Sequence, residues 1–180
     1  LRAGESVLIV GAGGGVNSVA LQLAKWAGAT VYALTSSEEK MAQAKALGAD
    51  EVINYREDSD WHKTIAQMTE RRGVDLVVDN VGQATLGHSM RALARGGRIV
   101  IVGNTSGPKT EIDIRYIFGK QISLIGSSMG TPQDFRDVMQ QVWSGAVHAP
   151  IDRVLPLSQG REAHVLIESG EKFGKVVLVP

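Results

Sequence analysis

A run of glycines near the amino terminus leaves several backbone amides without side-chain cover. Residues 11–16 read Gly-Ala-Gly-Gly-Gly-Val, directly after an apolar β-branched run and directly before a stretch with helical periodicity. The oxygens of a diphosphate need donors at about 3 Å, and side chains larger than hydrogen would hold the backbone away from them. A helix starting near Gly15 also directs its free N–H groups and positive dipole end at this place. The amides predicted to bind the diphosphate of a dinucleotide are those of Gly13, Gly14, Gly15 and Val16.

This glycine pattern departs from the strict dinucleotide-binding spacing. Counted from Gly11 the last glycine position holds Val16, and counted from Gly13 it holds Ser18. A tight strand-to-helix turn that binds nothing would use the same glycines. The strand before the turn, the helix after it and the repeating α/β units around it favour cofactor binding.

The segment about 20 residues further on indicates whether the site suits NAD(H) or NADP(H). Where an NAD(H) site has a carboxylate, at the end of the second predicted strand, this chain has Thr35, Ser36 and Ser37. Hydroxyls and a nearby cation would accept the 2′-phosphate of NADP(H), and Lys40 supplies that cation one turn past Ser36. We therefore predict NADP(H) rather than NAD(H). Two alternatives stay open, because Ser36 and Glu39 can form a capping box and Lys40 can lie on a solvated helix face.

The elements that must position these groups alternate between strands and helices. Apolar stripes at helical spacing separate short β-branched runs, which predicts a parallel sheet covered on both faces. The fold class predicted is α/β, a Rossmann-type doubly wound parallel sheet with a short C-terminal strand-helix-strand segment. Strands of the sheet are expected over residues 6–10, 30–34, 51–53, 74–79, 98–102 and 122–125. From about Ile151 a strand over 153–157, a helix over 161–168 and a strand over 175–179 form the tail.

Composition narrows the classes of partner. Nineteen basic residues balance nineteen acidic residues, so no net charge attracts nucleic acid or an anionic membrane. No apolar run reaches the roughly 20 residues needed to span a bilayer, and the amino terminus lacks a secretion signal. We expect a cytoplasmic protein that acts on a small-molecule substrate, with no nucleic acid and no membrane as a partner.

Metal ligands are not evident in the sequence. The chain contains no cysteine, so no disulfide and no Cys-ligated zinc can form within it. His62, His88, His148 and His164 show no ligand spacing, and we expect ordinary surface or packing roles for them. We therefore expect no metal site in this segment.

Several motifs follow one another in order along the whole chain: residues 11–16 with 20–25, then 36–40, 46–50, 52–55, 79–82, 96–100 and 174–178. Together they resemble one protein family, the medium-chain dehydrogenases and reductases, and within it the quinone oxidoreductase branch. Asn17 departs from the family, which usually has glycine there. Because asparagine adopts left-handed conformations more readily than most residues, we interpret Asn17 as a variant of the family motif.

The resemblance assigns further residues to the cofactor. It implies that Ser36, Lys40 and Tyr55 surround the adenosine end of the dinucleotide. It also implies that Asn80, Val102 and Gly103 lie along the ribose and nicotinamide. Asp79, by contrast, is expected to end a strand or cap the following helix.

The resemblance also implies a second, barrel-like domain formed mainly by the amino-terminal part of the chain. We expect residues 1–150 to be the NAD(P)-binding domain and residues 151–180 a return segment of that otherwise absent catalytic domain. The chain begins at Leu1 and enters a predicted strand within six residues, which favours a longer parent protein. The catalytic residues are expected in the absent part and stay unknown.

The function expected is NADP(H)-dependent hydride transfer to a quinone, enal or related carbonyl compound, without metal. One alternative is the cofactor-binding part of a zinc-dependent alcohol dehydrogenase. Another is a module that binds NADPH without turnover, and the isolated segment is expected to be inactive. The strand near 122–128 resembles the family's edge strand that pairs between subunits, so we expect a homodimer.

Overall fold

The computed structural model describes all 180 residues, and its main body is one parallel sheet of six strands in the order β3-β2-β1-β4-β5-β6. Every neighbouring pair in this sheet is parallel. The chain starts in the middle, runs outward to β3, then crosses back to β4 and continues to β6. The predicted doubly wound α/β fold is therefore confirmed. The strands are β1 (Ser6–Val10), β2 (Thr30–Thr35), β3 (Glu51–Asn54), β4 (Val74–Asp79), β5 (Leu93–Ile101) and β6 (Ser123–Gly126).

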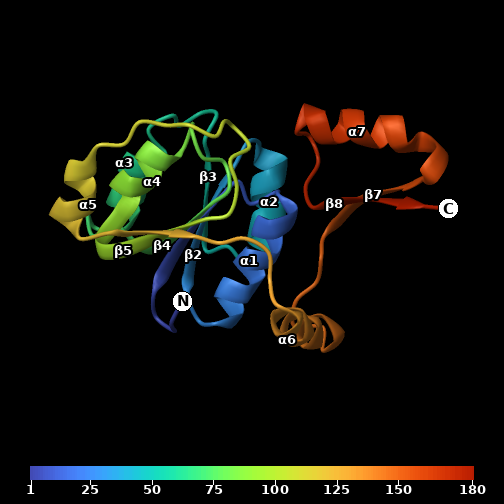
Figure 1. Ribbon diagram of the computed structural model, residues 1–180, viewed down its shortest axis with the longest axis horizontal. Coiled ribbons are helices and arrows are strands. Elements are labelled where there is room, and N and C mark those ends of the chain that lie inside the picture. Colours follow the sequence, from blue (N-terminus) through green and yellow to red (C-terminus); the bar gives the residue numbers. More distant parts are fainter.

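Helices cover both faces of this sheet (Figure 1). On one face, α1 (Gly15–Trp26) and α2 (Glu38–Ala46) pack against β1 and β2. On the other face lie α3 (Trp61–Met68), α4 (Leu86–Ala92) and α5 (Ile114–Lys120). The helix α6 (Pro132–Trp143) follows β6 and has no buried residue. None of the helices is long and apolar enough to cross a membrane.

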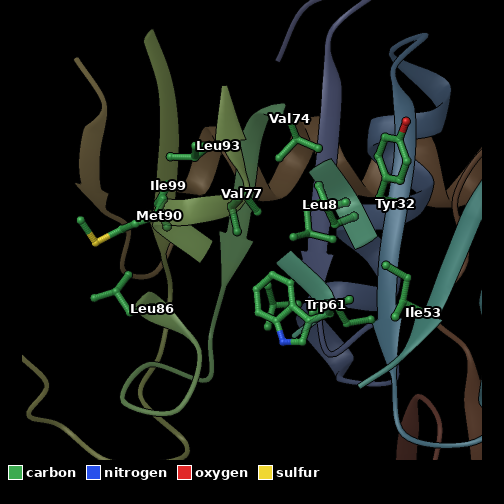
Figure 2. Packing of buried hydrophobic residues seen from close by; sticks show 14 of the residues in the cluster. Leu8, Tyr32, Ile53, Trp61, Val74, Val77, Leu86, Met90, Leu93 and Ile99 are labelled. Atoms are coloured by element: carbon green, nitrogen blue, oxygen red, sulfur yellow. The ribbon is translucent and has the colours of Figure 1, made fainter. Parts of the chain in front are cut away.

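The central strand shows why both faces need cover. Val7 and Ile9 of β1 belong to the core under α1 and α2, whereas Leu8 and Val10 belong to the core under α3 and α4. This division follows from the two-residue period of a strand. All four side chains are at most 2% exposed, and burying each contributes about 1.5–3 kcal/mol. Figure 2 shows Leu8 and Trp61 in the core under α3 and α4.

The tail forms a separate two-stranded parallel sheet. It consists of β7 (Ile151–Pro156), the 3₁₀ turn η1 (Leu157–Gln159), α7 (Gly160–Ser169) and β8 (Lys175–Val179). In Figure 1 this unit lies beyond α1 and α2, on the far side from α3–α5. The Gly174 amide donates to the Gly13 carbonyl over 2.9 Å, and the Gln22 side chain bonds the backbone of His148. The tail is thus anchored on the glycine-rich turn, and the segment that leads to it is anchored on α1.

Some boundaries differ from the sequence prediction. Strand β5 begins at Leu93 rather than at Arg98, because Leu93 pairs with Val74 before a shift of register. The short helices α3, α4 and α5 had no residues assigned from the sequence; each has only seven or eight residues, too few for a clear helical period.

Candidate functional site

A cavity of about 350 Å³ opens at the carboxyl end of the sheet, where β1 and β4 lie side by side. In doubly wound folds this is the crevice in which ligands bind, because the chain direction reverses there. The lining residues come from the glycine-rich turn, the ends of β2, β3 and β4, the loop after β5 and the tail: Gly11, Gly13, Gly14, Thr35, Ser36, Lys40, Tyr55, Asn80, Val81, Thr105, Ile167, Gly170 and Lys172.

The glycine-rich turn presents unpaired amides at one end of the cavity. Gly11 turns the chain with φ +81°, a conformation that favours glycine, and α1 then begins at Gly15. The N-cap residue Gly14 provides no side-chain cap. The amides of Gly13, Gly15 and Val16 donate to no backbone carbonyl. Gly13 and Gly14 line the cavity, whereas Gly15 and Val16 do not. Since α1 directs its positive dipole end at the same place, these free donors have the arrangement that an anion-binding turn needs.

Asn17 fastens this turn to the end of β4. It lies fully buried in the first turn of α1 in a helical conformation, so it does not use the left-handed backbone that asparagine tolerates. Its Nδ2 donates to the carbonyl oxygens of Val10 and Gly11 and, over 3.2 Å, to Asn80 Oδ1. The position that the family usually fills with glycine therefore holds a cross-link between the turn and Asn80.

The end of β2 differs from the sequence interpretation in two details. Ser37, not Ser36, caps α2, because its hydroxyl accepts from the Lys40 amide over 3.3 Å. Ser36 instead lies 3.4 Å from Lys40 Nζ, and both side chains line the cavity. Lys40 is only 9% exposed, so it does not lie on a solvated helix face. Glu38 and Glu39 are exposed and do not line this cavity.

The electrostatics of Lys40 favour an anion beside it. Burial lowers the pKa of Lys40, and the positive charges of Arg56 and Lys172 lower it further. Its Nζ also donates to the Gly170 carbonyl, which ties α2 to the end of α7. An anionic group in the cavity would compensate for the desolvation and the repulsion of this ammonium group.

Two further lysines come from the tail and were missed in the sequence analysis. Lys172 lines the cavity, and its pKa is lowered by burial and by the charge of Lys175. The Lys175 side chain lies over Gly15 so closely that a Cβ added there would be 2.7 Å from its Nζ. The block 174–178 was recognised as a family motif, but no pattern within the tail shows that it folds back onto the turn.

The remaining predicted residues surround the end of β4. Tyr55 lines the cavity and is 42% exposed, while its amide donates to the Thr35 carbonyl over 3.0 Å. Asn80 lines it as well. Val102 and Gly103 do not line it; Gly103 packs against Asn80, whose carbonyl oxygen would be 2.9 Å from an added Cβ.

Asp79 has a structural place beside them. It is 1% exposed, and its carboxylate accepts from the amides of Val81 and Gly82 and from the hydroxyls of Thr85 and Ser89. As expected it ends a strand, and it fixes the loop that carries Asn80.

A comparison with known protein families matches residues 15–144 to a family described as zinc-binding dehydrogenase. The chain belongs to this family. The predicted membership in the medium-chain dehydrogenases and reductases is thereby confirmed, as its cofactor-binding domain. Although the family description names zinc, the cavity is lined by no histidine and no carboxylate, so its residues do not fit a zinc ion.

Curated relatives match this chain over nearly its full length. A zinc-type alcohol dehydrogenase-like protein of Schizosaccharomyces pombe is 34% identical over 99% of the chain and 52% of the relative. An acryloyl-coenzyme A reductase of Sulfurisphaera tokodaii is 36% identical over 100% of the chain and 52% of the relative. A quinone oxidoreductase of Mus musculus is 33% identical over 99% of the chain and 56% of the relative. The chain thus spans about half the length of the relatives it matches.

Solved structures match the whole chain, including the tail. An NAD-dependent alcohol dehydrogenase superposes with a TM-score of 0.93 at 39% identity, over 99% of this chain and 52% of the other. A crotonyl-CoA carboxylase/reductase in complex with NADP superposes with a TM-score of 0.92 at 26% identity, over 99% and 50%.

Proposed function

We propose that this chain is the cofactor-binding part of an oxidoreductase that uses NADP(H). One observation carries the proposal: Lys40 and Lys172 line a cavity without any lining carboxylate, and this cavity adjoins the turn that holds the unpaired amides at the start of α1. A third lysine, Lys175, lies over Gly15 in the same turn. Such a site attracts a ligand with several negative charges at separate places. A dinucleotide with a diphosphate and a 2′-phosphate has this charge distribution.

The diphosphate is assigned to the start of α1. The amides of Gly13, Gly15 and Val16 would donate to its oxygens, with Gly14 leaving room for close approach. Lys175, whose ammonium group lies beside Gly15, would add a charge-assisted bond. Lys172 would strengthen the positive field from the tail side of the cavity.

The 2′-phosphate is assigned to Ser36 and Lys40, with the adenine beside Tyr55. The Ser36 hydroxyl and the Lys40 ammonium lie 3.4 Å apart, close enough to bind one phosphate together. Because no carboxylate lines this end, the usual discrimination against the 2′-phosphate is absent. Asn80, which lines the cavity, would contact the ribose and nicotinamide, together with Val102 and Gly103, which lie beside Asn80 outside the lining.

When bound, the dinucleotide supplies or accepts a hydride at its nicotinamide. The chain's own residues bind and orient it, and the catalytic residues for the substrate would come from the remaining half of the parent enzyme. The substrate class proposed is a quinone, enal or related conjugated carbonyl compound, without metal. The names of a quinone oxidoreductase and an acryloyl-coenzyme A reductase among the relatives support this class.

A second candidate function is the cofactor-binding part of a zinc-dependent alcohol dehydrogenase. Relatives named NAD-dependent alcohol dehydrogenase, one of them 35% identical over 98% of the chain, favour it. A third candidate is a module that binds the cofactor without turnover.

The domain boundary proposed near residue 150 follows from the separate sheet of the tail. Residues 1–150 would form the cofactor domain, and residues 151–180 would complete a catalytic domain built by the other half of the parent. Apolar side chains left exposed on the tail support this: Ile151, Val154, Leu157, Val165 and Ile167 are 47–64% exposed. A stable domain normally covers such a set.

We also propose a homodimer through β6. This strand is an outer strand of the six-stranded sheet, so one of its edges is free to pair with a second copy. Large apolar side chains of β6 and of the elements next to it in the sequence, α5, the loop after β6 and α6, are exposed by 42–96%, namely Ile114, Phe118, Ile125, Met129, Phe135 and Trp143.

Calorimetric titration of the protein with NADPH and with NADH tests the cofactor assignment. We expect NADPH to bind about tenfold more tightly or better, as an added phosphate contact of about 1.4 kcal/mol would give. Binding of neither nucleotide would overturn the proposal, and preference for NADH would favour the NAD-dependent alternative. Loss of NADPH absorbance with a panel of quinones and enals, using the complete enzyme, then separates turnover from binding alone.

A further inference from the structure

Two histidines far apart in the sequence meet on the face of the sheet that carries α3 and α4. His62 lies in the first turn of α3 and His88 in the first turn of α4, 26 residues later. Their Nδ1 atoms are 2.8 Å apart. No sequence spacing indicates this pair, so the ordinary roles expected from the sequence miss the relationship. Figure 1 shows the two helices side by side on this face.

A carboxylate completes the cluster. One ligand atom each from Asp60, His62 and His88 lies within 4.8 Å of the other two. Asp60 is the N-cap residue of α3, yet its side chain makes no capping hydrogen bond to the helix. It pairs instead with Lys63 over 2.5 Å and stays exposed. The carboxylate is therefore not committed to the helix and can turn to the imidazoles.

The core holds one of the imidazoles in place. Trp61 is 4% exposed, and Figure 2 shows its indole among the buried residues under α3 and α4. Its ring centroid lies 5.4 Å from that of His88 and 6.4 Å from that of His62. Both histidines are half-buried, so their ring positions are limited by packing rather than free in solvent.

We propose that Asp60, His62 and His88 bind a divalent transition-metal ion, with zinc as the best fit. Two imidazole nitrogens and one carboxylate oxygen are a donor set that zinc accepts, with water as the fourth ligand. Zinc–nitrogen bonds of about 2.1 Å in a tetrahedral site place two nitrogens about 3.4 Å apart. The two Nδ1 atoms, now 2.8 Å apart, reach this separation if the rings move apart by about 0.6 Å. The ion would clamp the start of α3 to the start of α4.

A zinc chloride titration followed by the imidazole signals in nuclear magnetic resonance tests the site in the unaltered protein. We expect the His62 and His88 signals to shift together, to an end point of one ion per chain, while those of His148 and His164 do not move. Magnesium chloride should shift none of them, because magnesium prefers oxygen ligands. If the pair is only hydrogen-bonded to itself, zinc leaves both signals unchanged and the proposal is overturned.

Variants then assign the ligands by calorimetry. His62→Ala and His88→Ala should each weaken zinc binding by about 100-fold or more, since losing an outer-shell partner alone costs roughly 10- to 100-fold. His164→Ala, which removes an exposed histidine of α7, is the matched control and should bind as before. Equal zinc affinity in His88→Ala and the unaltered protein would assign the ion to other groups and overturn the proposal.

Removal of Lys63, the cation that competes with zinc for Asp60, should increase the affinity for zinc rather than decrease it. Because Lys63 holds the Asp60 carboxylate, Lys63→Ala should tighten zinc binding by roughly twofold to fivefold, the strength of an exposed ion pair. Zinc at 100 times its dissociation constant should also raise Tm by roughly 5–10 °C. A Tm unchanged by saturating zinc would contradict a clamp between α3 and α4.

Discussion

The side-chain amide of Asn17 donates to Asn80 Oδ1 over 3.2 Å and so joins the first turn of α1 to the loop that follows β4. The same amide bonds the carbonyl oxygens of Val10 and Gly11 at the end of β1. One fully buried side chain thus fixes the distance between the turn assigned to the diphosphate and a residue assigned to the ribose.

Replacement of Asn17 by alanine should therefore affect both stability and binding. The carbonyl oxygen of Val10 would lose a buried partner, and we expect the free energy of unfolding to fall by about 1–3 kcal/mol in urea titrations. NADPH affinity should fall as well, because Asn80 would lose its support. Thr69→Ala, which removes side-chain hydrogen bonds to the Ile65 carbonyl and from the Gly73 amide before β4, at the opposite end of the sheet, should lower stability with little change in affinity. Unchanged stability of Asn17→Ala would contradict the cross-link.

The strands of the main sheet and its doubly wound class were predicted from the sequence with few errors, because buried parallel strands have continuous apolar sequences. Ser6–Val10 and Val74–Asp79 are strands with the same bounds as predicted. The short helices were not predicted, because their sequences are too short to show a helical period. The helix Leu86–Ala92 spans two turns, and its position depends on packing in a core shared with residues of other elements, such as Val77, rather than on the spacing of its own apolar residues.

The site residues in the glycine-rich turn and at the strand ends could be predicted from the sequence, whereas the lysines that the tail contributes could not. Gly13, Gly14 and Asn80 line the cavity because their strands end at the same edge of a parallel sheet. Lys175 approaches Gly15 only because Gly174 bonds the Gly13 carbonyl, a contact between residues 161 positions apart. No local period encodes such a contact.

Lys40→Ala should affect the affinity for NADPH but not the affinity for NADH. If its ammonium group binds the 2′-phosphate, NADPH affinity should fall by about 10- to 100-fold, as for a charge-assisted bond of about 1.5–3 kcal/mol, with NADH affinity nearly unchanged. The control is Lys45→Ala, one helical turn further along α2 and exposed. Calorimetric titration measures both, and an equal loss for NADPH and NADH would remove Lys40 from the 2′-phosphate site.

Lys175→Ala should weaken both cofactors together, since NADPH and NADH share the diphosphate that this residue is assigned to. We expect a loss of roughly tenfold for each, reduced at high salt because Lys175 is exposed. Fluorescence titration at low and high ionic strength measures the effect, again beside Lys45→Ala. A loss confined to NADPH would move Lys175 to the 2′-phosphate, against the proximity of its Nζ to Gly15.

Ile125→Lys should weaken the proposed homodimer. Ile125 lies in β6 and is 42% exposed, so a charge there costs little in the monomer but opposes pairing of two copies. Sedimentation at several concentrations should show the dimer dissociating at a concentration at least about tenfold higher than for the unaltered protein. Val154→Lys, an exposed apolar position of β7, is the matched control. A monomer in the unaltered protein at high concentration would contradict the dimer itself.

The ion pair between Glu5 and Arg98 predicts a loss of stability in acid. The Glu5 carboxylate accepts two hydrogen bonds from the Arg98 guanidinium group, at 2.9 and 2.8 Å, which hold the pKa of Glu5 at about 2 instead of 4.5. Because the pKa is lower in the folded state, the pair stabilises the protein above pH 4.5, and this contribution is lost as the pH falls from 4.5 towards 2. Since both side chains are partly exposed, we expect about 1 kcal/mol. Urea unfolding of Glu5→Gln beside the unaltered protein should show this difference at pH 7 and a smaller one at pH 3. A difference that stays constant across that range would mean that Glu5 acts through packing rather than through its charge.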